Sequence, residues 1–181
     1  MIIRKIDIKN FRSIKQLSWL PTSGVNCLIG RGDAGKSSVL AALDFIFSKN
    51  WNFQVLDTDF YNCQIDEPIE IVATITDFHE DLYSLSKFGH DTRGWNTTTL
   101  ELSDEPNDQC EVALTIKVTV DKSLEPEWVI LNDRLPEGKS IKGSDREKLG
   151  VLKYDASKTG QFSWTKGSLL SRLAPSNTHI T

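Results

Sequence analysis

The chain has 181 residues, of which 25% are charged and 39% are hydrophobic, and its formal net charge is −4. This length and composition are typical of one globular domain, or of one domain with a sizeable insertion, and they exclude a disordered chain. We find neither an apolar run as long as a membrane-spanning helix nor a signal peptide, so we expect no membrane partner. The three cysteines, Cys27, Cys63 and Cys110, lack CxxC spacing, which argues against disulfides or zinc and favours the reducing cytoplasm.

The charges are distributed unevenly along the chain. Residues 1–20 and residues 137–172 each carry a net charge of +4, whereas residues 21–136 carry −12. Two basic ends are typical of segments that meet nucleic acid or a partner, and they are equally typical of ordinary solvated surface. Charge alone leaves both interpretations open.

Alternating apolar residues predict a strand over residues 2–8, with Ile2, Ile6 and Ile8 on one face, and a second strand over 16–20. The same reasoning predicts strands at 68–78, 110–120, 128–131 and 151–154. We expect a polar stretch with a short helix at its start over 84–106, a charged loop over 138–150, and a helical turn over 168–173. The predicted fold class is α/β, with an antiparallel β insertion.

An apolar run at residues 25–29 is typical of a strand that is buried on both faces. A helix is expected after it, because a set of apolar residues recurs at helical spacing and would form one apolar face. That set is Val39, Leu40, Leu43, Ile46 and Phe47. The sequence therefore predicts a strand, a glycine-rich loop and a helix in direct succession.

The glycine-rich loop matches G-x-x-x-x-G-K-[ST], the phosphate-binding loop or Walker A motif. Its glycines allow successive backbone N–H groups to point at a phosphate, and the following helix adds its positive N-terminal end. Lys36 would reach the β- and γ-phosphates, the Ser37 hydroxyl would bind Mg²⁺, and Asp33 would face solvent or cap the helix. The predicted nucleotide site comprises Gly30, Arg31, Gly32, Asp33, Ala34, Gly35, Lys36, Ser37 and Ser38.

Residues 6–14 read Ile-Asp-Ile-Lys-Asn-Phe-Arg-Ser-Ile. Together with the loop, they resemble the N-terminal part of the RecF, SMC and OLD-type (overcoming lysogenisation defect) ATPases, which have ABC-like heads. Residues 145–150 and 166–173 look most like the ATPase part of OLD-type ATP-dependent endonucleases. One departure is Gly32, where the family loop usually has asparagine.

This resemblance implies the P-loop NTPase fold of an ABC/SMC-like head lobe that binds ATP and Mg²⁺. It places Arg12 near the nucleotide phosphates and makes Gln54 or Asp59 a candidate for positioning Mg²⁺ and water. In the complete protein it implies an ATP hydrolase with a second head as partner (a homodimer or higher), coupled to a DNA endonuclease outside this chain, in DNA repair or phage defence. The expected organisation is one incomplete head lobe over 1–181, with a P-loop core at 1–50, an acidic β-rich insertion at 51–136 and a basic return segment at 137–181.

Two parts of a complete ATPase site have no match in the sequence. Residues 72–77 are interrupted by threonines and lack the paired Asp-Glu of a Walker B strand, so we interpret them as an insertion strand. Residues 157–161 imitate the ABC signature but have one residue too many. We therefore expect poor hydrolysis by the chain alone, and a nucleotide sensor without hydrolysis stays open as an alternative. A P-loop GTPase should carry N-K-x-D, which is absent. A small-molecule kinase should carry lid arginines and an acceptor pocket, which the acidic β insertion does not resemble.

Overall fold

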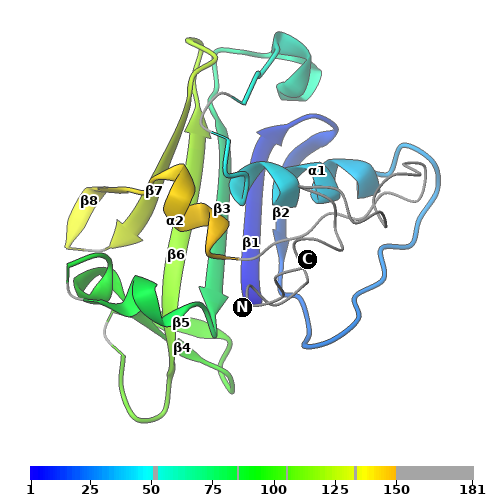
Figure 1. The fold of residues 1–181 in the computed structure, drawn as a ribbon. Coiled ribbons are helices and arrows are strands. Elements are labelled where there is room, and N and C mark those ends of the chain that lie inside the picture. The colour runs from blue at the N-terminus through cyan, green and yellow to red at the C-terminus, as the bar shows by residue number, and fades with distance from the viewer. Residues whose placement is uncertain (51–52, 85, 105, 133, 150–181) are drawn as a thin grey trace, which may run out of the picture. The chain divides into compact units, whose positions relative to one another are not determined.

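The computed structural model of the chain describes residues 1–50, 53–84, 86–104, 106–132 and 134–149. Within this part, eight strands form one antiparallel sheet in the order β2-β1-β3-β6-β4-β5, with β7 paired to β6 and β8 paired to β7 (Figure 1). The strands are β1 (Ile2–Phe11), β2 (Ile14–Trp19), β3 (Ile69–Thr76), β4 (Arg93–Asn96), β5 (Glu101–Ser103), β6 (Glu111–Val120), β7 (Pro126–Asn132) and β8 (Leu135–Ser140). The strands predicted at 2–8, 16–20, 68–78, 110–120 and 128–131 are confirmed, with shifted bounds.

The centre of the sheet is formed by β1, β3 and β6. Ile6 and Ile8 of β1 are buried at 0% and 1% exposure, while Lys9, which follows them on the opposite face of the strand, is exposed. Strand β1 pairs with β2 on one side and with β3 on the other. The sheet is therefore continuous across residue 51, where the sequence suggested the start of an insertion.

Helix α1 (Lys36–Ile46) begins directly after the glycine-rich loop, as predicted, and packs against β1, β3 and β6 (Figure 1). Its buried residues are Ser38, Val39, Ala42, Phe45 and Ile46. The expectation that Leu40 belongs to the apolar face is wrong, because Leu40 is 56% exposed. The residue follows Val39 by one position, which turns it about 100° around the helix axis, away from the sheet.

The strand predicted at residues 25–29 is wrong. These residues form no strand, and Val25 and Ile29 are 96% and 88% exposed. A strand needs a neighbour that satisfies its backbone N–H and C=O groups, and no strand of the described residues pairs with this run. Apolar composition alone therefore does not produce a strand here.

Two segments contain more secondary structure than expected. The polar stretch 84–106 includes β4 and β5, and β4 pairs with the first residues of β6. The segment expected as a loop at 138–150 contains the end of β8 and a short helix, α2 (Gly143–Glu147). Both elements form because they dock on structure that is distant in sequence. The elements predicted at 151–154 and 168–173 lie outside the described residues.

Arg146 anchors α2 to the rest of the fold. Its guanidinium is buried, donates through Nε to the Ser48 carbonyl at 2.6 Å and through Nη1 to the Ile141 carbonyl at 2.8 Å, and lies 4.0 Å from the Trp128 ring centroid. Burial lowers the pKa of Arg146 to about 10, so the side chain remains charged at neutral pH. Because Ser48 follows α1, this contact ties α2 to the end of the loop helix.

Among the described residues, no helix combines the length and the apolar character that crossing a bilayer requires.

Candidate functional site

The turn into α1 requires glycine at position 35. Gly35 has a φ of +81° and precedes the first helical residue, Lys36. A Cβ atom at this position would lie 3.4 Å from the Ser13 Oγ and 3.6 Å from the Ile14 Cγ1. The chain that follows β1 therefore lies in van der Waals contact with this position, and a side chain at Gly35 would be strained by the left-handed backbone.

The Lys36 side chain folds back over the loop. Its Nζ donates to the Gly30 carbonyl at 2.9 Å and also to the Arg31 carbonyl. Asp33, with a φ of +59°, is exposed and makes no cap on α1. The ammonium group of Lys36 therefore lies beside the loop backbone, and the carboxylate of Asp33 faces solvent.

A cavity of about 720 Å³ lies beside the loop. Five residues of the predicted site line it, together with both candidates for positioning magnesium and water. The predicted residues are Arg12, Asp33, Gly35, Ser37 and Ser38, and the two candidates are Gln54 and Asp59. The structure thus brings the end of β1, the start of α1 and residues 53–59 to one hollow.

A second cavity, of about 570 Å³, adjoins the same turn. It is lined along β2, by residues 27–29 and by the remaining loop residues Ala34 and Lys36, and it shares Gly35 with the first cavity. Gly30, Arg31 and Gly32 are exposed at the start of the loop. Arg12 and residues 33–38 therefore line the two cavities, whereas Gly30, Arg31 and Gly32 line neither of them.

Arg12 and Asp59 form an ion pair on the first cavity. The Arg12 Nε donates to the Asp59 Oδ1 at 2.8 Å, and the Arg12 backbone N–H donates to the Asp59 carbonyl at 2.7 Å. The Asp59 Oδ2 accepts from the Leu56 N–H at 3.1 Å. Both carboxylate oxygens of Asp59 are therefore engaged within the chain, whereas the Gln54 side chain is exposed on the cavity.

Ser13 belongs to the site and was not identified from the sequence. Its hydroxyl lies 2.7 Å from that of the buried Ser38, and this hydrogen bond joins the turn after β1 to the first turn of α1. The two serines are 25 positions apart, so no local pattern links them. Only the fold reveals the pair.

Residues 72–77 do not supply a Walker B carboxylate. They belong to β3 and its end, and β3 runs antiparallel between β1 and β6 at the centre of the sheet; the interpretation of residues 72–77 as part of an insertion stays a prediction. Asp77 forms an ion pair of 3.7 Å with the N-terminal amino group. It therefore lies at the start of β1, roughly 30 Å from Arg12 at the far end of that strand. The described residues contain no cluster of three His, Cys, Asp or Glu side chains that could hold a metal ion.

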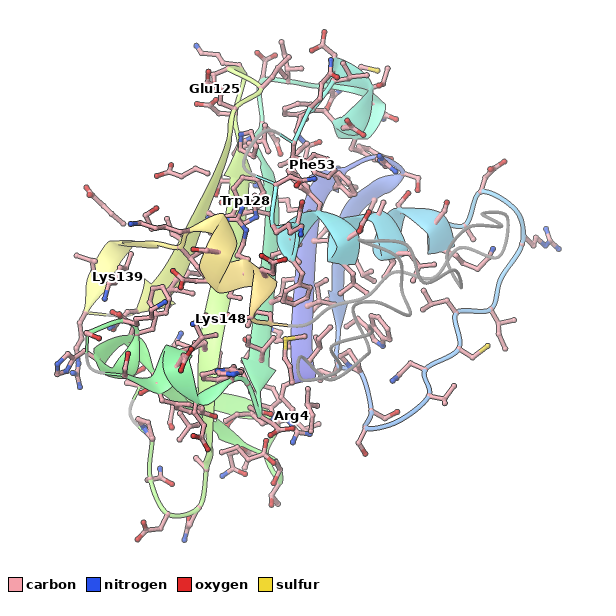
Figure 2. The ribbon with its side chains drawn as sticks, viewed as in Figure 1. Arg4, Phe53, Glu125, Trp128, Lys139 and Lys148 are labelled. Atoms are coloured by element: carbon pink, nitrogen blue, oxygen red, sulfur yellow. The ribbon has the colours of Figure 1, made fainter. Side chains whose placement is uncertain are left out.

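The basic segment at 137–149 is largely paired within the chain. Lys139 forms an ion pair of 3.3 Å with Asp91, Lys148 pairs with Asp81, and Arg146 is buried. Lys139 and Lys148 are labelled in Figure 2, on β8 and after α2. Hydrogen bonding and charge from Lys148 hold the pKa of the Asp81 carboxyl below its usual value. These contacts make the segment part of the packing of this fold.

Comparison with known proteins extends these observations. The family model described as "AAA ATPase domain" matches residues 1–158. Over 49 residues, or 26% of the chain, the sequence is 41% identical to a Structural maintenance of chromosomes protein 3 homolog of Plasmodium falciparum (isolate 3D7). The chain spans only 4% of the length of that curated relative.

Two solved structures that match this chain come from work on SMC proteins. One comes from a study of ATP-driven dimerization and DNA stimulated activation of SMC ATPases, with a TM-score of 0.50, 15% identity, and coverage of 82% of this chain and 77% of the other. The second is an SmcHead bound to the C-winged helix domain of ScpA, with a TM-score of 0.49, 16% identity, and coverage of 82% and 39%. The fold class predicted from the sequence is confirmed. This chain belongs to the AAA ATPase domain family and has the P-loop NTPase fold of SMC-like ATPase heads.

Proposed function

We propose that this chain is the ATP-binding lobe of an ABC/SMC-like ATPase and that MgATP binds at residues 30–38. The observation that carries the proposal is the first cavity, which is lined both by the cation that directly follows β1 and by the start of the loop helix. Arg12 and Ser37 both line it, and they come from elements that the sequence separates by the whole loop.

Each part of the site has a role in this proposal. The N–H groups of the loop and the N-terminal end of α1 favour anionic phosphates, and Lys36 adds a positive charge when it exchanges its bonds to the loop carbonyls for phosphate oxygens. Mg²⁺ prefers oxygen ligands, and the exposed Ser37 hydroxyl and Gln54 amide provide such atoms on the same cavity. When bound, the ion would neutralise charge on the phosphates.

Hydrolysis in this proposal belongs to the complete protein. Residues 72–77 lack the paired Asp-Glu of a Walker B strand, and Asp77 lies at the opposite end of β1 from Arg12. The SMC ATPases of similar fold are described as dimerising in an ATP-driven manner, which supports a second ATPase head as the partner that completes this site.

The finer assignment is to an OLD-type or RecF-type protein of the cytoplasm that acts on DNA in repair or in defence against phage. It rests on the resemblance of residues 145–150 and 166–173, with the nuclease outside this chain. Most of the basic side chains at 137–149 already form ion pairs within the chain or are buried, so we expect the chain alone to bind duplex DNA weakly. The division into 1–50, 51–136 and 137–181 is part of the same proposal.

Binding of nucleotide is tested by thermal unfolding. A ligand at one hundred times its dissociation constant stabilises the folded state by about 2.7 kcal/mol, so MgATP should raise the melting temperature of the full chain. The rise should be lost in Lys36→Ala. A melting temperature that does not respond to MgATP at millimolar concentration would contradict the proposal.

One alternative is a nucleotide sensor that binds ATP without hydrolysing it. The observation that favours it is the engagement of Asp59 by Arg12 and Leu56, which leaves no free carboxylate on the first cavity apart from the exposed Asp33. Both functions predict slow hydrolysis by the chain alone. Adding the remainder of a head should accelerate turnover if the chain is an ATPase lobe, and should leave it unchanged if the chain is a sensor.

A further inference from the structure

The end of β1 has an unusual backbone. Asn10 and Arg12 have φ values of 55° and 51°, in the left-handed region that side chains other than glycine rarely adopt. Phe11 between them is 2% exposed. Such a conformation persists only where the surrounding structure enforces it, and it is common at functional sites.

Residues 56–67 enforce this conformation. The Asn10 Nδ2 donates to the Gln64 carbonyl at 3.2 Å and to the Glu67 carbonyl at 2.5 Å. Phe11 forms an isolated β-bridge with Phe60. One segment therefore fixes the strand end on both sides of the buried phenylalanine, and with it the direction in which Arg12 leaves the strand.

Asp59 adds a bond to the Arg12 side chain itself. The carboxylate is mostly buried, with 14% of its side chain exposed, whereas 43% of the Arg12 side chain is exposed. A half-exposed arginine would sample many rotamers, and a charge-assisted bond from a carboxylate held by the Leu56 N–H restricts it. The bond uses the Nε of Arg12, so the two Nη groups stay available for other acceptors.

We propose that Asp59 is a positioning residue for Arg12: it holds the guanidinium by its Nε so that the Nη groups can bind phosphate oxygens of a nucleotide on the first cavity. The inference rests on the proposed function, since Arg12 has this role only if a nucleotide binds at residues 30–38. In this proposal Asp59 is not a magnesium ligand, because both of its carboxylate oxygens already accept hydrogen bonds within the chain.

The test is a double-mutant cycle on nucleotide affinity, measured by calorimetry with the full chain. The variants are Asp59→Ala, Asp59→Asn, Arg12→Ala and the double variant Asp59→Ala/Arg12→Ala. Asp59→Asn preserves the shape of the side chain and keeps the test valid if the alanine variant does not fold. Asp57→Ala is the matched control, because Asp57 is an exposed carboxylate of the same short turn and does not line the cavity.

If Asp59 acts through Arg12, both Asp59 variants should weaken MgATP binding about five- to tenfold, and the double variant should bind no more weakly than Arg12→Ala alone. Asp57→Ala should stay within about twofold of the wild type. The coupling between Asp59 and Arg12 should be the same for ATP without magnesium.

Three results would overturn the role of Asp59. If Asp59→Ala lowered the affinity for MgATP by the same factor in the wild type and in Arg12→Ala, Asp59 would only stabilise its own turn. A loss that occurs only with magnesium would make it a metal ligand. Tighter ATP binding by the Asp59 variants would show that Asp59 competes with the nucleotide for Arg12. In all three cases ATP would still bind and depend on Lys36, whereas failure of the proposed function would appear as a wild-type chain without ATP binding.

Discussion

At the scale of single residues, the loop depends on one backbone position that only glycine suits. Gly35 combines a left-handed conformation with the close approach of Ser13, and neither property is shared by Gly32, whose Cβ would meet no atom within 4 Å. The Walker A spacing predicts residues 30–38 as one nucleotide site; residues 33–38 line the two cavities at the loop, and nucleotide binding there stays a prediction. The spacing could not predict the Arg12–Asp59 and Ser13–Ser38 bonds, because those depend on how distant segments fold together.

Gly35→Ala should lower the free energy of unfolding by about 1–2 kcal/mol, because alanine in the left-handed region is strained. Gly32→Ala, which adds the same methyl group to the same loop, should change it by less than about 0.5 kcal/mol. Denaturant unfolding of both variants measures the difference. Equal effects of the two substitutions would contradict the assigned geometry.

Arg146→Ala should destabilise the fold by about 2–4 kcal/mol. The substitution removes charge-assisted bonds to the Ser48 and Ile141 carbonyls and the contact with the Trp128 ring, and it leaves buried carbonyls unpaired. Lys142→Ala removes a positive charge from the exposed residue that precedes α2 and serves as the control, with an expected effect below about 0.5 kcal/mol. If the two variants unfold at the same denaturant concentration, Arg146 is not the anchor of α2.

At the scale of elements, an aromatic cluster connects the loop helix with the sheet and with the cavity. Phe45 of α1 stacks on Phe53 at 4.4 Å and meets the Trp128 ring edge-on at 5.7 Å. Figure 2 shows Phe53 and Trp128 close together near one end of α1. Phe53 lines the first cavity, and Trp128 carries Arg146 on its face. Phe53 and Trp128 of β7 therefore pack against Phe45 of the loop helix, and α2 contacts the cluster through Arg146 on the Trp128 ring.

Elements with a long, regular pattern were predictable from the sequence, and elements defined by pairing were not. Strands β1, β3 and β6 have many β-branched residues, and their alternation or apolar runs identify them. By contrast, β5 has only three residues, and it forms because β4 lies beside it. Residues 25–29 are the opposite case, since they have strand composition without a partner. The local sequence does not determine whether a partner strand lies beside such a segment.

A pair of identical substitutions tests this description of residues 25–29. Ile29→Ala should change the free energy of unfolding by less than about 0.5 kcal/mol, because the side chain is 88% exposed. Ile71→Ala, at a fully buried position in β3, should lower it by about 2–5 kcal/mol. A loss at Ile29 as large as that at Ile71 would show that residues 25–29 are a buried strand in solution.

At the scale of the whole molecule, the described residues form one sheet beside the glycine-rich loop, and they contain no cluster of three His, Cys, Asp or Glu side chains that could hold a metal ion. The family match over residues 1–158 agrees with this arrangement. The net charge of −4 and the internal pairing of Lys139 and Lys148 weaken the case for a DNA surface at residues 137–149. The central claim therefore concerns nucleotide binding, and DNA binding by a complete protein stays a proposal.

Calorimetric titration of MgATP into the full chain and into Lys36→Ala tests that claim most directly. Removal of the lysine deletes a charge-assisted contact to phosphate and should weaken binding by about 1.5–3 kcal/mol, roughly ten- to 150-fold. Lys122→Ala is the control, because Lys122 is an exposed cation between β6 and β7 and lines neither of the two cavities at the loop. Its affinity should match that of the wild type. Equal MgATP affinity of the wild type and Lys36→Ala would contradict the assignment of residues 30–38 as the nucleotide site.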